Sequence, residues 1–256
     1  MIMKKDLIKR TQNKRLWVSL GILAACVVGI IIVLVSTAAN QRDTTVAVIN
    51  GMEIDVREFR MIAEEERALV LRAFCDRYDV QPDEGFWQRE FDGATPAETL
   101  QQQTLDKLAV IKVQQEMMIE YGLLKDAGYT AFFQEWVQEN QHRQQAVSQD
   151  DPIYGVNTYT EKQYYQVRLD KGTLALKEKL ASTILKVSAA ESNQFYEQRQ
   201  EAFLFDEKGN LKPFAELKNV IEKRIVDEKY EKMIAEKAQK ASVHIVKKNM
   251  KRVQFN

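Results

Sequence analysis

The sequence of 256 residues is poor in cysteine, histidine and proline, with two, two and four residues respectively. Beyond residue 43 only Cys75 remains, and one cysteine cannot form an internal disulfide, so this part of the chain must be stabilised by packing. Few prolines interrupt it, and Glu, Lys, Gln, Ala and Leu are frequent, which favours helices. We therefore expect a mainly α-helical domain.

The sequence also lacks the motifs of the common catalytic and metal sites. It contains no C-x-x-C, no H-E-x-x-H and no carboxylate-rich loop with calcium spacing. A glycine-rich phosphate-binding loop and a G-x-S-x-G elbow are absent as well. Serine, aspartate and histidine occur, but without geometry they indicate no catalytic site. We therefore predict no catalytic, cofactor-binding or metal-binding residues and no cofactor.

Charge is unevenly distributed along the sequence. The whole chain is formally neutral, whereas its first fifteen residues carry six lysines and arginines and one aspartate. The net charge of those fifteen residues is +5, so the rest of the chain carries about −5. A mildly acidic domain is ordinary for a soluble protein and argues against a nucleic-acid partner.

An uncharged, apolar segment runs from Leu16 to Val35. As a helix its twenty residues would span roughly 30 Å, the thickness of the hydrocarbon core of a bilayer. The basic residues before it favour a cytoplasmic N-terminus. We expect residues 1–15 to be a cytoplasmic tail and residues 16–36 to be a single transmembrane helix or uncleaved signal anchor. The rest of the chain would then lie outside the cell membrane.

Two alternatives remain for this segment. Ser36-Thr37-Ala38 resembles the cleavage site of a secretory signal peptide. Leu23-Ala24-Ala25-Cys26 resembles a bacterial lipoprotein signal, with lipid attached to Cys26. Anchoring, cleavage and lipidation all place the following domain outside the cytoplasm.

The segment VAVINGMEIDVREF, residues 46–59, predicts a strand, a tight turn and the start of a helix. Alternating apolar residues indicate a strand at Val46–Asn50, and Asn50-Gly51 is a turn dipeptide. Asp55 and Glu58 have the D-x-x-E spacing of a capping box. The other clear strand candidate is ASVHIVKK, with Val243 and Ile245 alternating, so we expect the first and last strands to pair.

Between these strands, capping residues and 3.6-residue periodicity predict helices. They are expected from Asp55 to about Tyr78, from Thr95-Pro96 to about Asp126 with Gly128 as terminator, from Thr130, from the Thr160–Gln163 box to about Lys186 with a possible break at Gly172, from the Ser188–Glu191 box, and from Pro213 to about Lys240. Residues 79–95 form a loop or short irregular helix, in which Phe86, Trp87 and Phe91 either cover the core or make a contact patch.

Three segments resemble SurA/PrsA-type extracytoplasmic chaperones. VAVINGMEIDVREF resembles their opening motif, LLKDAGYTAFFQEWVQENQHR their central helices, and FAELKNVIEKRIVDEKYEKMIAEKAQKASVHI their closing helix and strand. The resemblance covers most of residues 44–247. It implies a helical domain like the SurA N-terminal domain at residues 44–250, mainly α with a small two-stranded β element that joins the first and last strands.

One departure from that family affects activity. Its foldases carry a parvulin-type prolyl isomerase domain before the closing helix, whereas here that junction, Phe203 to Leu211, has nine residues. The two histidines, His142 and His244, lie in a polar helical stretch and in the closing strand and do not match the active-site pair of that domain. The resemblance therefore implies a chaperone scaffold without the isomerase.

Large apolar or amphipathic side chains are the candidates for binding a polypeptide client. Methionine adapts to irregular partners, and aromatic rings supply contact area at low entropic cost. The candidates, each of which could instead belong to the core, are Met117, Met118, Phe132, Phe133, Trp136, Tyr164 and Tyr165.

We expect a membrane-anchored extracytoplasmic protein that binds unfolded or partly folded exported polypeptides without ATP or covalent chemistry. The first alternative is a dedicated protein–protein interaction module on the same scaffold. The second is a protein of the peptidyl-prolyl isomerase family with residual activity. The client and the oligomeric state stay open.

Overall fold

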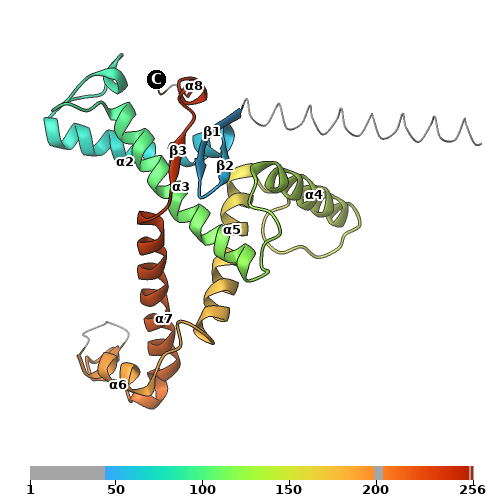
Figure 1. The fold of residues 1–256 in the computed structure, drawn as a ribbon. Helices are drawn as coiled ribbons and strands as arrows, with labels where there is room; N and C mark the ends of the chain where they lie inside the picture. The colour runs from blue at the N-terminus through green and yellow to red at the C-terminus, as the bar shows by residue number, and fades with distance from the viewer. Residues whose placement is uncertain (1–43, 199–203, 254, 256) are drawn as a thin grey trace, which may run out of the picture. The chain divides into compact units, whose positions relative to one another are not determined.

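The structure, a computed structural model, describes residues 44–198, 204–253 and 255. Val46–Asn256 form one compact unit, largely helical, with a small sheet. In chain order its elements are β1 (Thr45–Ile49), β2 (Met52–Asp55), α2 (Val56–Tyr78), the 3₁₀ turn η1 (Phe86–Gln88), α3 (Pro96–Glu120), α4 (Tyr129–Ser148), α5 (Glu161–Ala181), α6 (Ala189–Gln198), α7 (Phe214–Gln239), β3 (Val243–Ile245) and α8 (Lys247–Met250) (Figure 1).

Within the described ranges no helix is both long enough and apolar enough to cross a bilayer. The predicted basic tail, the predicted membrane segment at residues 16–36 and Cys26 all lie outside those ranges.

The first and last strands pair, as the sequence predicts. β1 and β3 are antiparallel, with Ala47 opposite Ile245 and Ile49 opposite Val243. The prediction of a two-stranded element is wrong, because β2 adds a third strand in the order β2-β1-β3. Asn50 and Gly51 both have positive φ, 48° and 81°, and such a two-residue turn returns the chain as a hairpin. The residues after the turn therefore pair with β1 before the helix begins.

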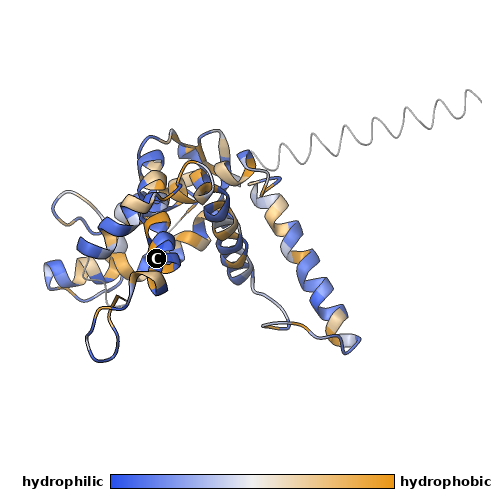
Figure 2. Ribbon diagram, turned by 90° about the horizontal axis from the view of Figure 1, so that it is seen from below, coloured by the Kyte–Doolittle hydropathy of each residue, from blue (hydrophilic) through white to orange (hydrophobic). Residues whose placement is uncertain are grey.

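Helix α3 forms the centre of the fold and packs against α2, α5 and α7. Its first half lies under the sheet, where Leu105 and Leu108 meet Val46, Ile49 and Phe59 in one buried cluster. Its second half contributes Val113, Met117 and Met118 to a second buried cluster with α5 and α7. Hydrophobic and hydrophilic residues are interleaved along the long helices (Figure 2), as expected for helices that bury one face.

The segment between α2 and α3 covers the core. Phe86 and Trp87 are only 1% and 6% exposed, and they pack against Val70 of α2 and Leu100 of α3. Of the two interpretations of this loop, the structure supports a lid over the core for these two rings.

The structure confirms several predicted helix starts. The side chain of Thr95 caps α3, and Thr160–Gln163 and Ser188–Glu191 form the predicted capping boxes. Residues 206–210 form a turn before α7, with the amide of Asp206 bonded to the carbonyl of Asn210 at 2.8 Å.

Other predicted boundaries are wrong. Helix α3 ends at Glu120, not near Asp126, because Gly122 adopts a left-handed φ of 68° and turns the chain. Gly128, not Thr130, is the N-cap of α4. Helix α5 runs through Gly172 without a break and ends at Ala181, earlier than predicted.

Candidate functional site

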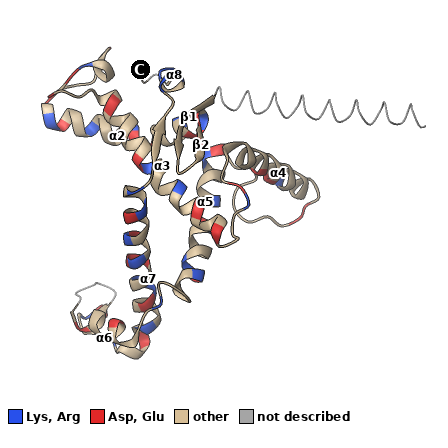
Figure 3. Cartoon of the chain, in the orientation of Figure 1, with Lys and Arg blue, Asp and Glu red and all other residues tan. Residues whose placement is uncertain are grey.

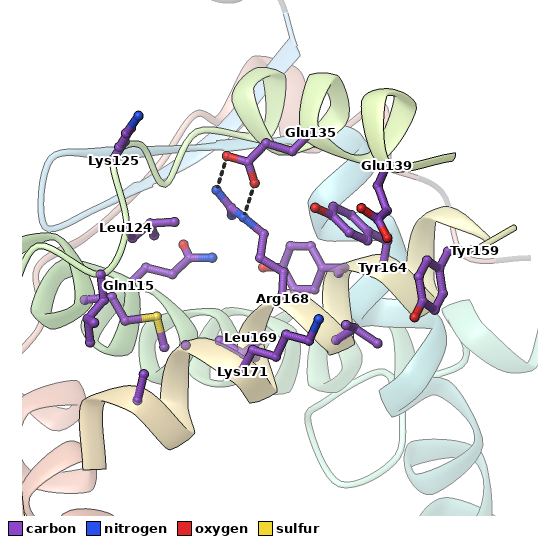
Figure 4. Close-up of a pocket in the computed structure, with 16 residues that line it drawn as sticks. Gln115, Leu124, Lys125, Glu135, Glu139, Tyr159, Tyr164, Arg168, Leu169 and Lys171 are labelled. Atoms are coloured by element: carbon purple, nitrogen blue, oxygen red, sulfur yellow. Dashed lines mark hydrogen bonds and ion pairs between the residues drawn. The ribbon is translucent and has the colours of Figure 1, made fainter. Parts of the chain in front are cut away.

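One pocket lies between the end of α3, the loop at residues 121–128, α4 and α5 (Figure 4), and we call it the α4–α5 pocket. Its volume is about 410 Å³, within the range of roughly 300–1,000 Å³ that is typical of ligand pockets. Helices and the loop supply its apolar and aromatic lining, which includes Met118, Leu123, Leu124, Tyr159, Tyr164, Tyr165, Val167, Leu169 and Ala175.

Two arginine–glutamate pairs fix the polar side of this pocket. Arg168 of α5 pairs with Glu135 of α4, with Nε and Oε2 2.7 Å apart, and it also donates to the carbonyl of Asp126 at 2.8 Å. Figure 4 shows this pair joining the two helices. Arg143 pairs with Glu139 at 2.7 Å within α4. Both carboxylates that line the pocket are therefore neutralised.

Two aromatic side chains line the same pocket beside these pairs. The guanidinium of Arg143 stands over the ring of Tyr159, 4.3 Å from its centroid. Burial raises the pKa of Tyr164, and the nearby Glu135 and Glu139 raise it further. The phenol of Tyr164 is therefore protonated at neutral pH and can act as a hydrogen-bond donor.

A buried ion pair lies behind the pocket. The ammonium of Lys112 is fully buried and bonds to Glu58 Oε1 at 2.8 Å, to Gln115 Oε1 at 3.0 Å and to the carbonyl of Ala127 at 3.1 Å. The hydroxyl of Tyr165 also donates to Glu58 Oε1, at 2.7 Å. Gln115 and Tyr165 line the pocket as well, so this network holds two of its wall residues in place.

Tyr165 stays protonated in this network. Burial raises the pKa of Tyr165 well above its usual value, and the carboxylate of Glu58 adds to the effect.

Glu58 was expected to close a capping box with Asp55, but Asp55 accepts from the amide of Arg57 and Glu58 turns into the core. The spacing rule fails here because Lys112, 54 residues further along the chain, provides a stronger partner.

A second hollow, the α5–α7 groove, has a volume of about 500 Å³. Its apolar residues are Leu174, Ala181, Val187 and Val226. Its charged residues comprise three basic and three acidic side chains, namely Lys177, Glu178, Lys186, Glu222, Lys223 and Asp227. Figure 3 shows both signs of charge along α5 and α7. The groove is therefore lined by apolar side chains together with equal numbers of basic and acidic ones.

One ion pair ties the two sides of this groove together. Lys177 Nζ of α5 lies 2.7 Å from Asp227 Oδ1 of α7, and the ammonium also stands 4.9 Å from the ring centroid of Tyr230. Leu174, one turn before Lys177, is 53% exposed, although it is a large apolar residue on the groove. It is the most accessible apolar side chain at this site.

The seven residues predicted to bind clients are all buried or half-buried. Four are buried, namely Met117, Met118, Phe132 and Tyr165. Three are half-buried on α4 and α5, namely Phe133, Trp136 and Tyr164. Met118, Tyr164 and Tyr165 meet in the α4–α5 pocket, whereas Phe133 packs on Trp136, whose indole N–H donates to the carbonyl of Tyr159 at 2.8 Å.

Sequence reasoning missed the α5–α7 groove. Leu174 and Val226 sit in amphipathic helices, where an apolar residue is normally buried. Their spacing therefore contains no signal that α5 and α7 leave part of their facing surfaces open.

In the part of the chain that the structure describes, no three potential metal ligands of the His, Cys, Asp or Glu type come together. The chain matches no family model, no curated protein and no solved structure.

Proposed function

We propose that this protein is a membrane-anchored, extracytoplasmic chaperone-like protein that binds unfolded or partly folded exported polypeptides without ATP or covalent chemistry. The observation that carries the proposal is the α5–α7 groove, which presents the half-exposed Leu174 between balanced charges. The resemblance of residues 44–247 to SurA/PrsA-type chaperones and the apolar segment at residues 16–35 support the location and the class of client.

The groove suits weak and unselective binding of apolar segments. Burying apolar surface contributes roughly 25 cal/mol per Å², so a leucine-sized side chain that buries about 100 Å² contributes about 2.5 kcal/mol. Ordering the client offsets much of that gain. Because Lys177 and Asp227 neutralise each other across the groove, neither acidic nor basic clients are rejected outright. Binding would therefore be reversible and would need several contacts.

The test is suppression of aggregation by the full-length chain in lipid nanodiscs, with a client that unfolds on mild heating. We expect suppression at several-fold excess over the client, and no suppression by empty nanodiscs. Leu174→Glu should weaken it, because the change replaces the most exposed apolar side chain of the groove with a charged one. Leu69→Glu is the matched control, since Leu69 of α2 is 61% exposed and lies away from both hollows.

Absence of suppression by the unmodified chain would refute the proposal. If Leu174→Glu and Leu69→Glu reduced the suppression of aggregation equally, client binding would have to be assigned to a surface other than the α5–α7 groove.

The α4–α5 pocket favours the alternative of a dedicated interaction module. Arg168 is fixed there by Glu135 and by the carbonyl of Asp126, which makes the pocket a preformed site rather than an adaptable one. Affinity capture with the full-length chain separates the two functions. One folded partner at fixed stoichiometry would support the module, and a spread of unfolded clients would support the chaperone.

No isomerase activity is part of the proposal. In the junction where the resembling foldases carry their parvulin domain, Phe205 and Leu211 pair across a tight turn at residues 206–210. A proline-peptide isomerisation assay should show no rate above background.

A further inference from the structure

We propose that the α4–α5 pocket binds one large apolar side chain of a peptide whose flanking residues are acidic. The inference rests on the proposed function in taking a polypeptide as the ligand, and it adds a preference that the α5–α7 groove does not have.

The charged side chains of the pocket are not all paired. Its two lining carboxylates are held by arginines, Glu135 by Arg168 and Glu139 by Arg143. Two lysines also line it, Lys125 from the loop and Lys171 from α5. Both are exposed, and neither has an ion-pair partner among the described residues. Among the residues that line the pocket, Lys125 and Lys171 are therefore the two cations that form no ion pair with a described residue.

The two unpaired lysines belong to different segments of the chain. Lys125 comes from the loop and Lys171 from α5, and in Figure 4 the amine of Lys125 points away from the other lining side chains, whereas Lys171 lies beside Leu169. Their ammonium groups end long, flexible side chains, so they can reach carboxylates in the flanks of a bound peptide. A peptide with basic flanks would meet the same two cations and be repelled.

The rest of the pocket lining includes apolar side chains. Met118, Leu124 and Leu169 provide apolar surface. The sulfur of Met118 packs on α5, where a Cβ at position 172 would stand 2.6 Å from Sδ and the end of the Met118 side chain would have to shift. Methionine sulfur adapts to aromatic and aliphatic partners alike. The interior therefore offers apolar surface to one large apolar side chain.

The groove between α5 and α7 provides the internal comparison. It carries three basic and three acidic residues and has no charge excess, so it gives no reason for a preference between acidic and basic flanks. A charge preference that depends on Lys125 and Lys171 would therefore come from the α4–α5 pocket and not from this groove.

The test uses two fluorescent peptides that differ only in the flanks of one central phenylalanine, acidic in one and basic in the other. Binding to the full-length chain in neutral-lipid nanodiscs is followed by anisotropy. Two exposed ion pairs predict roughly three- to tenfold tighter binding of the acidic peptide at low salt. The preference should vanish at about 1 M salt, where the screening length is about 3 Å.

Charge reversal assigns the preference to the pocket. Lys125→Glu combined with Lys171→Glu should favour the basic peptide. Lys232→Glu combined with Lys248→Glu changes the net charge equally at two exposed lysines away from both hollows and should leave the preference for the acidic peptide unchanged.

Equal affinity for the two peptides, no binding of either, or the same preference in both double variants would overturn the proposal. The outcome is separate from that of the proposed function. A chain that suppresses aggregation, loses this with Leu174→Glu and yet shows no charge preference would retain the chaperone function and lose only this assignment of the pocket.

Discussion

Replacing Lys112 with methionine should lower the free energy of unfolding by about 3–5 kcal/mol, the usual cost of removing one partner of a buried ion pair. Methionine has a similar length but supplies none of the three hydrogen bonds of the ammonium. Glu58 would keep only the hydroxyl of Tyr165, because its second oxygen, Oε2, already has no hydrogen-bond partner among the described residues. The variant therefore leaves a carboxylate in the core with a single donor.

The assay is urea unfolding of the full-length chain in a mild non-ionic detergent, followed by tryptophan fluorescence, to which the buried Trp87 contributes. Lys107→Met on the same helix is the matched control. Lys107 pairs with Glu65 and Glu66, but its side chain is 40% exposed, so its loss should cost at most about 1 kcal/mol.

A second change tests the mechanism. Glu58→Gln in the Lys112→Met background removes the stranded charge and should restore most of the lost stability, giving a coupling of about 2 kcal/mol or more between the two sites. A cost below about 1 kcal/mol for Lys112→Met, or additive single changes, would refute the reasoning.

Three further predictions concern the loop, an electrostatic cap and the sheet. Phe86→Ala should cost about 3–5 kcal/mol in urea unfolding, because the ring is 1% exposed in the core. Lys229 and the Ser188 cap lower the pKa of Glu191 to about 2. The stabilising effect of the ionised Glu191 should therefore be complete above its usual pKa of about 4.5 and disappear as the pH falls towards 2. In an NMR titration, Lys229→Met should raise the pKa of Glu191. Asn50→Ala should cost about 1–2 kcal/mol in the same unfolding assay, because Asn50 has a φ of 48° and its side chain accepts from the amide of Ser242.

Local chemistry made much of the fold predictable. Asn50-Gly51 marks a turn because both residues tolerate positive φ, and the alternation of Val243 and Ile245 identified the strand that pairs with β1. Capping residues such as Thr95 and Thr160 located helix starts because they satisfy free amides within three residues. Each of these signals lies within a few positions of its effect.

The features that sequence reasoning missed depend on distant partners. Glu58 obeys a local capping rule, yet Lys112 of another helix determines its conformation. The α5–α7 groove arises from how two helices separated by α6 approach each other, and neither helix alone contains that information. Of the seven residues predicted to bind clients, four are large because they fill the core.

Site-specific photo-crosslinking on the full-length chain in lipid nanodiscs tests the central claim most directly. A photoreactive residue replaces Leu174 in the α5–α7 groove or, as the control, Leu69 on α2. With an unfolded client we predict crosslinks from position 174, their competition by unlabelled client, and few from position 69. Equal yields at the two positions, or crosslinks that a folded form of the same client forms equally well, would contradict the proposal that this groove holds unfolded polypeptides.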